Sequence, residues 1–342
     1  MTFKFNKYFR PGKFLRPLII AEVSANHCGK KSLFLKSIKS AAQNGADLIK
    51  IQTYEAEDIT INRNLNKKKF NKKNLWDLYS KAQTPYSWHK DAFSLAKKLK
   101  IQLFSSPFST RAVDFLQSMH VKIYKIASFE INDLKLVKKI AETKKPVIVS
   151  TGMASLKEIK ECVKTINKYH NKIALLHCVS GYPTPESEAN LKRILSLKKN
   201  FKKLNIGLSD HTNNITTSIA SIPYNVVFIE KHFILSKKLK SLDKNFSINP
   251  KELKELSRIS KVVFSSLGKG DFKVQKHEKI SLKYRRSIYS IKKIKKGEKF
   301  TYNNISTYRP KIGLSAKLFF KVLGKKAKKN INSYTPIYSS YF

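Results

Sequence analysis

The sequence predicts an α/β protein whose main part is a closed (β/α)8 barrel, and three observations support that fold class. Short apolar runs alternate with helix-like stretches about eight times along the chain. Several of these runs are apolar throughout, which is typical of parallel strands buried on both faces. Together the units occupy roughly 250 residues, a length that fits a TIM barrel better than an open sheet.

The expected strands are rich in Ile, Val and Leu. They cover residues 18–25, 48–54, 101–106, 121–128, 146–151, 173–180, 205–211 and 226–233. In the stretches between them, apolar residues recur every three or four positions, which indicates amphipathic helices. The helices we expect most clearly cover residues 32–46, 89–100, 109–119, 155–169 and 251–267. The barrel domain is therefore expected to span residues 1–267.

A boundary is predicted after the last of these helices. Residues 268–284 are polar and show neither helical nor strand periodicity, so we interpret them as a linker. Residues 285–342 contain short β-like pieces and turn signals at 297–298 and 310–313. A segment of this size is expected to form a small accessory domain.

The composition is strongly basic. The 342 residues include 69 Lys and Arg against 23 Asp and Glu, a formal net charge of +46, and the cations are nearly all lysines spread along the chain. We interpret this dispersed excess as a solvated basic surface. No nucleic-acid partner is expected, because base readout favours Arg and Asn on an element that fits a groove. A positive field would also steer anionic substrates.

The sequence predicts a cytoplasmic protein without membrane contact. No apolar run approaches the roughly 18–20 residues that cross a bilayer. The basic N-terminal segment has only a short apolar part, which runs directly into Glu22, and it lacks the small-residue cleavage site of a signal peptide. The three cysteines are odd in number and show no CxxC spacing, which fits a reducing compartment.

Every predicted strand ends in polar side chains. In a barrel of this type the active site lies at the C-terminal ends of the strands. Lys50 and Lys125, with hydroxyl neighbours, are suited to hold a phosphate or carboxylate. His211 and His232 lie on adjacent predicted strands, and two imidazoles can hold a divalent metal that polarises a carbonyl oxygen. Glu22 could act as a general base or orient a water. Such a set favours carbon–carbon bond formation between a phosphorylated enol and an aldehyde.

A structural role is the default interpretation for three other histidines, His27, His89 and His177. A rival interpretation of the whole chain is a barrel that binds polyanions and has lost catalysis. The combination of Glu22, the two lysines and the histidine pair argues against that rival.

Several motifs together resemble the sialic acid synthases, which extend an N-acetylated hexose by three carbons from phosphoenolpyruvate. The motifs are IIAEVSANH (19–27), GADLIKIQTY (45–54), FSSPF (104–108), YKIASFEI (124–131), STGM (150–153), LLHCVSGYPTP (175–185), IGLSDHT (206–212) and IEKHF (229–233). Residues 285–342 resemble the antifreeze-protein-like (SAF) domain of that family. Within the family, TPYSWH (84–89) and HCVSGYPTP (177–185) are most similar to the pseudaminic acid synthases.

The resemblance implies a substrate pair and a site. The substrates are phosphoenolpyruvate and an N-acetylated amino sugar, 2,4-diacetamido-2,4,6-trideoxy-L-altrose, with an N-acetylneuraminate or legionaminic acid precursor as the alternative sugar. By resemblance Glu22 positions or deprotonates water. The positions that match phosphoenolpyruvate-binding residues are Lys50, Gln52, Lys125, Ser128 and Ser150. His211 and His232 match two metal ligands, for Mn2+ or alternatively Co2+ or Mg2+, and Tyr182 and Asp243 match sugar contacts.

The resemblance also implies an assembly. Arg309 in YRP matches an arginine that the small domain delivers to the barrel of a partner subunit, so a domain-swapped homodimer is expected. The planar fork of a guanidinium suits the polar groups of a sugar, which gives this position a reason to be Arg in a chain dominated by Lys.

Overall fold

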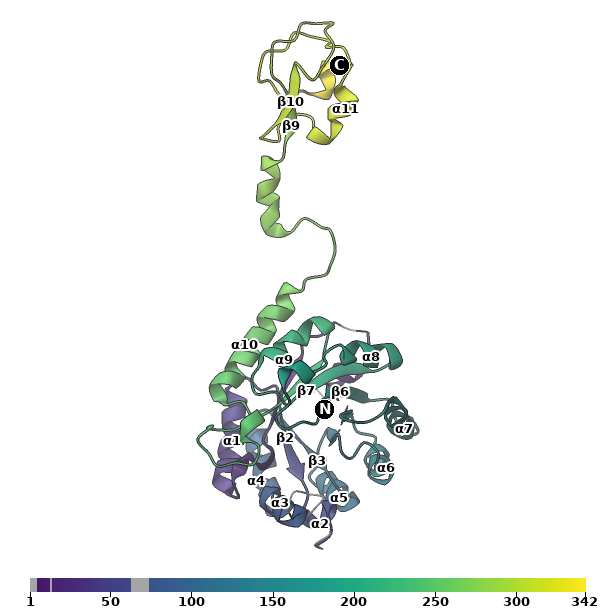
Figure 1. The fold of residues 1–342 in the computed structure, drawn as a ribbon, viewed down its shortest axis with the longest axis vertical. Helices are drawn as coiled ribbons and strands as arrows, with labels where there is room; N and C mark the ends of the chain where they lie inside the picture. The colour runs from purple at the N-terminus through teal and green to yellow at the C-terminus, as the bar shows by residue number, and fades with distance from the viewer. Residues whose placement is uncertain (1–4, 13, 63–73) are drawn as a thin grey trace. The chain divides into compact units, whose positions relative to one another are not determined.

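The computed structural model describes residues 5–12, 14–62 and 74–342, and contacts within the chain divide it into two compact units (Figure 1). The first unit is Met1–Gly268 and the second is Lys269–Phe342. Each unit has its own apolar core and is described by itself.

The first unit is a closed barrel of parallel strands, as predicted. Each strand pairs with the next along the chain, and β8 pairs with β1 to close the ring. The strands are β1 (Leu18–Glu22), β2 (Leu48–Thr53), β3 (Gln102–Pro107), β4 (Tyr124–Ile126), β5 (Val147–Ser150), β6 (Ile173–Cys178), β7 (Asn205–Asp210) and β8 (Phe228–His232). All eight expected strands are thereby confirmed, with ends that differ by a few residues.

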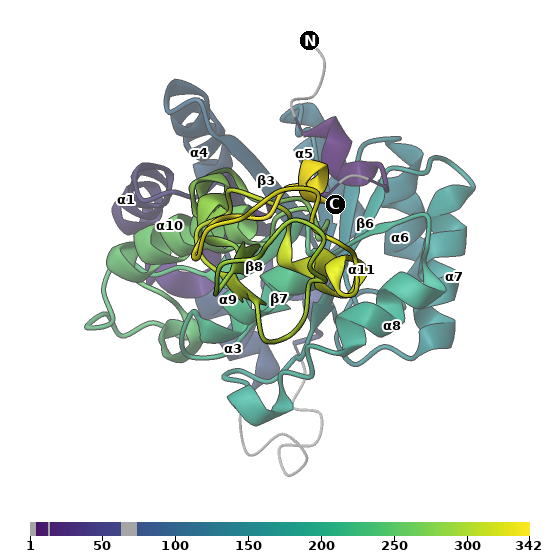
Figure 2. The same cartoon turned by 90° about the horizontal axis from the view of Figure 1, so that it is seen from above.

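Helices surround the strands, and α6 and α7 lie side by side on the outside of the barrel in both views (Figures 1 and 2). The helices of this unit are α1 (Lys31–Gln43), α2 (Ala56–Ile59), α3 (Leu75–Ala82), α4 (Tyr86–Lys98), α5 (Thr110–Ser118), α6 (Leu134–Glu142), α7 (Leu156–Asn167), α8 (Arg193–Asn200), α9 (Thr216–Ala220) and α10 (Pro250–Ser266). The five individually expected helices correspond to α1, α4, α5, α7 and α10. The last two begin with capping boxes, Ser155 with Glu158 and Asn249 with Glu252.

Two apolar layers leave only one end of the barrel for chemistry. One layer packs between strands and helices, and a second fills the barrel interior with side chains such as Ile20, Leu48 and Phe104. Gly207 on β7 is required in that interior, because an added Cβ would lie 2.7 Å from the carbonyl oxygen of Phe228. The short 3-10 helix η1 (Asn6–Phe9) contributes two buried aromatic rings to the same cluster. The buried charged side chains Glu22, Lys50, Lys125 and Glu230 lie beyond this apolar layer, toward the C-terminal ends of the strands.

The second unit is small and rests on a two-stranded antiparallel sheet. Strand β9 (Ser287–Ser290) pairs with β10 (Ile305–Tyr308), and α11 (Phe319–Val322) packs nearby. The segment that was interpreted as a linker contains a 3-10 helix, η6 (Lys276–Tyr284). None of its residues is buried, so its sequence shows no periodic apolar pattern from which a helix could be predicted. The remaining 3-10 helices of the chain are η2 (Ser24–His27), η3 (Glu186–Glu188), η4 (Ile222–Tyr224), η5 (Lys244–Phe246), η7 (Ala316–Leu318) and η8 (Ser339–Tyr341).

Across residues 5–12, 14–62 and 74–342, none of the helices has the length and apolar character that crossing a bilayer requires.

Candidate active site

The strand register brings the predicted residues together at the C-terminal end of the barrel. Glu22, the last residue of β1, is the Cα partner of Lys50 on β2 and also of His232 on β8. Side chains of a strand alternate between its two faces, so partners at the same level of adjacent strands share a face. Three of the residues expected to carry chemistry therefore point into the same space.

Four buried charges form the centre of this site. The Nζ atom of Lys50 lies 2.8 Å from Oε1 of Glu230 and 3.0 Å from Oε2 of Glu22. The Nζ atom of Lys125 lies 3.8 Å from the same oxygen of Glu230. We call these four residues the charge cluster; each is at most 4% exposed. An ion removed from water to this degree costs several kcal/mol, so each charge requires a partner of opposite sign.

Burial and neighbouring charges shift the pKa values of the cluster in opposite directions. Burial lowers the pKa of Lys50 to about 8, although Glu230 acts to raise it. For Glu230 burial acts to raise the pKa, but Lys125 and Lys50 outweigh it and hold the pKa well below its usual range. Burial raises the pKa of the nearby Glu130 to about 7. Glu230 is therefore ionised at neutral pH, while Lys50 is close to losing its proton.

Hydroxyl groups complete a surface that suits an anion. Lys125 Nζ donates to Oγ of Ser150 at 2.6 Å, and the hydroxyls of Ser128 and Ser180 lie 2.8 Å apart. Gln52 lies two residues after Lys50 on β2 and is half-buried. Beside it in the register, Ser106 has a buried hydroxyl with no hydrogen-bond partner among the described residues. A bound anion would supply acceptors for these donors.

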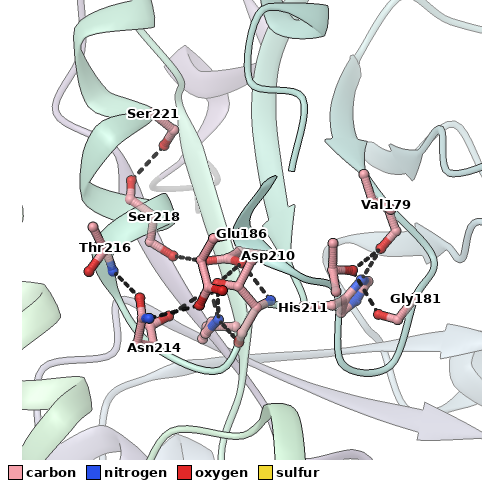
Figure 3. Close-up of polar contacts among 12 residues, drawn as sticks. Val179, Gly181, Glu186, Asp210, His211, Asn214, Thr216, Ser218 and Ser221 are labelled. Carbon is pink, nitrogen blue, oxygen red and sulfur yellow. Dashed lines mark hydrogen bonds and ion pairs between the residues drawn. The ribbon is translucent and has the colours of Figure 1, made fainter. Parts of the chain in front are cut away.

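The two predicted metal ligands face each other. The ring centroids of His211 and His232 are 5.5 Å apart. Nδ1 of His211 lies 2.8 Å from the carbonyl oxygen of Val179 (Figure 3). A carbonyl only accepts, so this nitrogen carries the proton and Nε2 keeps its lone pair. Burial, with a smaller effect of His232, lowers the pKa of His211 to about 3, and the ring is neutral at physiological pH.

The two predicted sugar contacts lie beside the imidazoles. Oδ2 of Asp243 is 3.5 Å from Nδ1 of His232, and that nitrogen has no hydrogen-bond partner among the described residues. The ring of Tyr182 lies 4.5 Å from that of His211, measured between centroids, and is 44% exposed. Both residues therefore border the same space as the imidazole pair.

Three histidines that were expected to be structural lie outside this centre. His27 Nδ1 accepts from the N–H of Gly29, His89 Nε2 contacts the hydroxyl of Thr53, and His177 Nε2 lies 2.8 Å from a backbone carbonyl. Each of these rings has a polar contact of its own, which fits the default interpretation. Arg309 is exposed on the second unit, and its role at the site stays a prediction.

Two residues of this site were missed as individual candidates. Glu230 accepts from both Lys50 and the hydroxyl of Ser209, and the hydroxyl of Ser106 has no partner within the part of the chain that the structure describes. A signal for Glu230 was available, because it lies two residues before His232 on the same strand and must share its face.

Comparisons with known proteins show the family of this chain. Residues 37–272 match the model of the NeuB family, and residues 285–340 match the SAF domain. The chain belongs to the NeuB family. The resemblance to sialic acid synthases that the motifs indicated is thereby confirmed, as is the C-terminal SAF domain.

Individual members of the NeuB family are similar over nearly the whole chain. A pseudaminic acid synthase of Campylobacter jejuni serotype O:2 is 41% identical over 92% of this chain and 93% of its own length. An N,N'-diacetyllegionaminic acid synthase of the same strain is 39% identical over 92% of this chain and 97% of its own. The crystal structure of N-acetylneuraminic acid synthetase from Leptospira borgpetersenii superposes with a TM-score of 0.72 at 31% identity, covering 80% of this chain and 92% of that one.

Replacing Lys125 is expected to weaken the anion site without unfolding the barrel. A hydrogen bond to a charged group contributes about 1.5–3 kcal/mol, so Lys125→Met should raise the Kd of phosphoenolpyruvate roughly 10- to 100-fold. Isothermal titration calorimetry measures this, with circular dichroism to establish folding. Lys122→Met is the matched control, because Lys122 lies three residues earlier and is exposed. Equal affinities for the two variants would remove Lys125 from the anion site.

The lowered pKa of Lys50 predicts pH-dependent binding. An anion binds the ammonium form, and that form is lost as pH rises through about 8. The Kd of phosphoenolpyruvate should therefore increase about tenfold per pH unit above roughly pH 8.5. A Lys50→Arg variant keeps its charge throughout this range, so its Kd should change little between pH 8 and 9.5. Parallel pH profiles for the two proteins would contradict the assignment.

Proposed function

We propose that this protein is a pseudaminic acid synthase, which condenses phosphoenolpyruvate with 2,4-diacetamido-2,4,6-trideoxy-L-altrose and releases phosphate. The observation that carries the proposal is the juxtaposition of two buried lysines with an adjacent pair of imidazoles. The similarity to pseudaminic acid synthases over 92% of the chain supports the same activity. The three unpaired cysteines suit the cytoplasm, which we propose as its compartment.

Phosphoenolpyruvate is proposed to bind at the charge cluster and its hydroxyls. Its phosphate would take hydrogen bonds from Lys125 and Ser150, and Lys50 would contribute a second positive charge. Gln52 and Ser128 complete the proposed binding set. Glu230 already shares both lysines, so it sets their positions before the anion arrives. Binding then requires little rearrangement of the protein.

The imidazole pair fits a divalent metal. His211 offers an unprotonated Nε2, and His232 is buried with an Nδ1 that lacks a hydrogen bond among the described residues. Within residues 5–12, 14–62 and 74–342, no group of three or more His, Cys, Asp or Glu is arranged to hold a metal, so the protein supplies a pair of ligands. We propose Mn2+, the ion that the resemblance to the sialic acid synthases implies for these two histidines. When bound, this ion would supply a Lewis acid for the aldehyde of the open-chain sugar.

Glu22 is proposed to position and deprotonate the water molecule that attacks carbon 2 of phosphoenolpyruvate. Both of its carboxylate oxygens are buried without a hydrogen bond among the described residues, although Oε2 lies 3.0 Å from Lys50 Nζ. Carbon 3 of phosphoenolpyruvate attacks the aldehyde carbon, whose oxygen takes up a proton. Water adds to carbon 2, and one of its protons passes through Glu22 to the former aldehyde oxygen. The other proton leaves with the phosphate as carbon 2 becomes a keto group. The bond between carbon 2 and the phosphate oxygen then breaks, and the lysines stabilise the departing phosphate.

The sugar is proposed to lie against Tyr182 and Asp243. Tyr182 is partly exposed beside His211, and Asp243 is next to His232, so both can touch a sugar whose aldehyde is held at the imidazole pair. The legionaminic acid synthase is nearly as similar to this chain as the pseudaminic acid synthase is, so the identity of the sugar requires a direct test.

A phosphate-release assay tests the activity. The purified protein, with phosphoenolpyruvate and Mn2+, is given 2,4-diacetamido-2,4,6-trideoxy-L-altrose, the N,N'-diacetyllegionaminic acid precursor or N-acetylmannosamine. We expect phosphate release with the first sugar and a product whose mass equals pseudaminic acid. Faster release with another sugar would reassign the substrate. Absence of release with every sugar, together with salt-sensitive binding of DNA, would favour the polyanion-binding alternative.

The oligomer is also a proposal: a homodimer in which the SAF domain of one subunit supplies Arg309 to the barrel of the other. The exposed guanidinium of Arg309 and the separate core of the second unit support it.

Mixing two inactive variants distinguishes a swapped from an unswapped site. Lys125→Met damages the barrel and Arg309→Ala damages the SAF domain. In a swapped heterodimer one of the two sites is intact, so statistical mixing should restore about a quarter of the wild-type activity. Each variant alone stays inactive. Without swapping every site keeps one defect, and a mixture that remains inactive after subunit exchange would exclude the swap.

A further inference from the structure

Behind the imidazole pair lies a second pair of buried charges that the proposed reaction does not use. Asp210 immediately precedes His211, and Lys231 immediately precedes His232. Oδ2 of Asp210 lies 3.2 Å from Nζ of Lys231, and the two side chains are at most 2% exposed. They are also direct Cα partners, where the β7–β8 ladder ends. We call this pair the rear ion pair.

The rear ion pair lies on the opposite side of the strands from the imidazoles. In Figure 3 the carboxylate of Asp210 faces Ser218 of α9, whereas the ring of His211 lies toward Val179. This follows from the alternation of side chains along a strand. Neither member of the pair can touch a ligand held between the imidazoles, so any effect on that ligand must act through the histidines.

Asp210 and Lys231 both hold the backbone next to His211, whose own carbonyl oxygen accepts from the N–H of Thr184 at 3.0 Å. His211 lies just beyond the end of β7, where the ladder no longer fixes the chain. Oδ1 of Asp210 accepts from the N–H of Thr212 at 2.9 Å and from its hydroxyl at 2.8 Å. Lys231 Nζ donates to the carbonyl oxygen of Thr212. The residues before and after His211 are therefore both tied to the residue that precedes His232.

Stability alone does not account for this arrangement. A buried ion pair is often no more stabilising than apolar side chains of similar volume, because desolvation offsets the Coulomb attraction. Two apolar side chains at these positions would pack between β7 and β8 equally well. They would not hold the turn after His211 to β8, because they offer no donor to the Thr212 carbonyl.

We infer that Asp210 and Lys231 are positioning residues that fix the separation and orientation of His211 and His232 for a divalent metal. This inference rests on the proposed function, since it takes the imidazole pair to be the metal site. Groups that hydrogen-bond to metal ligands typically change metal affinity 10- to 100-fold when they are replaced, and we take the same range for this pair, which acts through Thr212.

Direct Mn2+ binding tests the inference, with free Mn2+ followed by electron paramagnetic resonance. We expect Lys231→Met and Asp210→Asn to raise the Mn2+ Kd roughly 10- to 100-fold. The Kd of phosphoenolpyruvate, measured without metal, should change less than about twofold, because the charge cluster is untouched. Ser105→Ala is the matched control: it removes a buried hydroxyl between β3 and β2, 2.6 Å from Thr53, and should leave both constants unchanged.

Two further variants make every outcome decisive. His211→Ala removes a proposed ligand, and if wild type binds Mn2+ no more tightly than this variant, the proposed metal site itself fails. If wild type binds more tightly but folded Lys231→Met matches wild type, only the positioning inference is overturned. If the charge variants fail to fold, Ser218→Ala is the variant that tests the inference. It removes the hydrogen bond from the Ser218 hydroxyl to Asp210 but leaves the ion pair with Lys231 in place. We expect it to raise the Mn2+ Kd several-fold, and an unchanged Kd would contradict the inference.

Discussion

The burial of two ammonium groups beside two carboxylates is the constraint on which the rest of this structure depends. Glu22, Lys50, Lys125 and Glu230 come from four different strands and lie almost entirely out of water. Each charge in this setting must keep a partner, because an unpaired buried ion costs several kcal/mol. A closed barrel satisfies that demand by bringing the strand ends to one centre from all sides. An open sheet would leave β1 and β8 at opposite edges and would separate Glu22 from Glu230.

The strands were predictable because burial on both faces leaves a strong record in composition. Residues 173–178 are apolar almost throughout, and an apolar run as short as this is typical of a strand inside a covered parallel sheet. Short helices leave a weaker record. Helix α9 (Thr216–Ala220) has five residues, too few for an apolar stripe to repeat, and it was not predicted individually. Helices α6 and α8 were likewise not expected one by one.

The site was predictable as a set of residue types and only partly as an arrangement. Lysine, histidine and glutamate at strand ends indicated a site for an anion and a metal. The strand register, which makes Glu22 the neighbour of both Lys50 and His232, could not be predicted from the sequence pattern. The approach of Asp243 to His232 depends on the loop after β8, which follows no period. Ser106 is noticed only once its hydroxyl is found buried without a partner among the described residues.

Alternation along β7 and β8 separates two roles that the sequence places side by side. In the dipeptides Asp210–His211 and Lys231–His232 the histidine belongs to the imidazole pair, and the charged residue before it belongs to the rear ion pair on the other side of the strands. Lys231 is as buried as Lys50 and Lys125, yet it faces away from them, so the presence of a lysine at a strand end does not by itself assign it to the anion site. A one-residue slip of β8 would exchange Lys231 for His232 on the inner face. It would also break the rear ion pair, so that pair and the imidazole pair require the same register of β8 on β7.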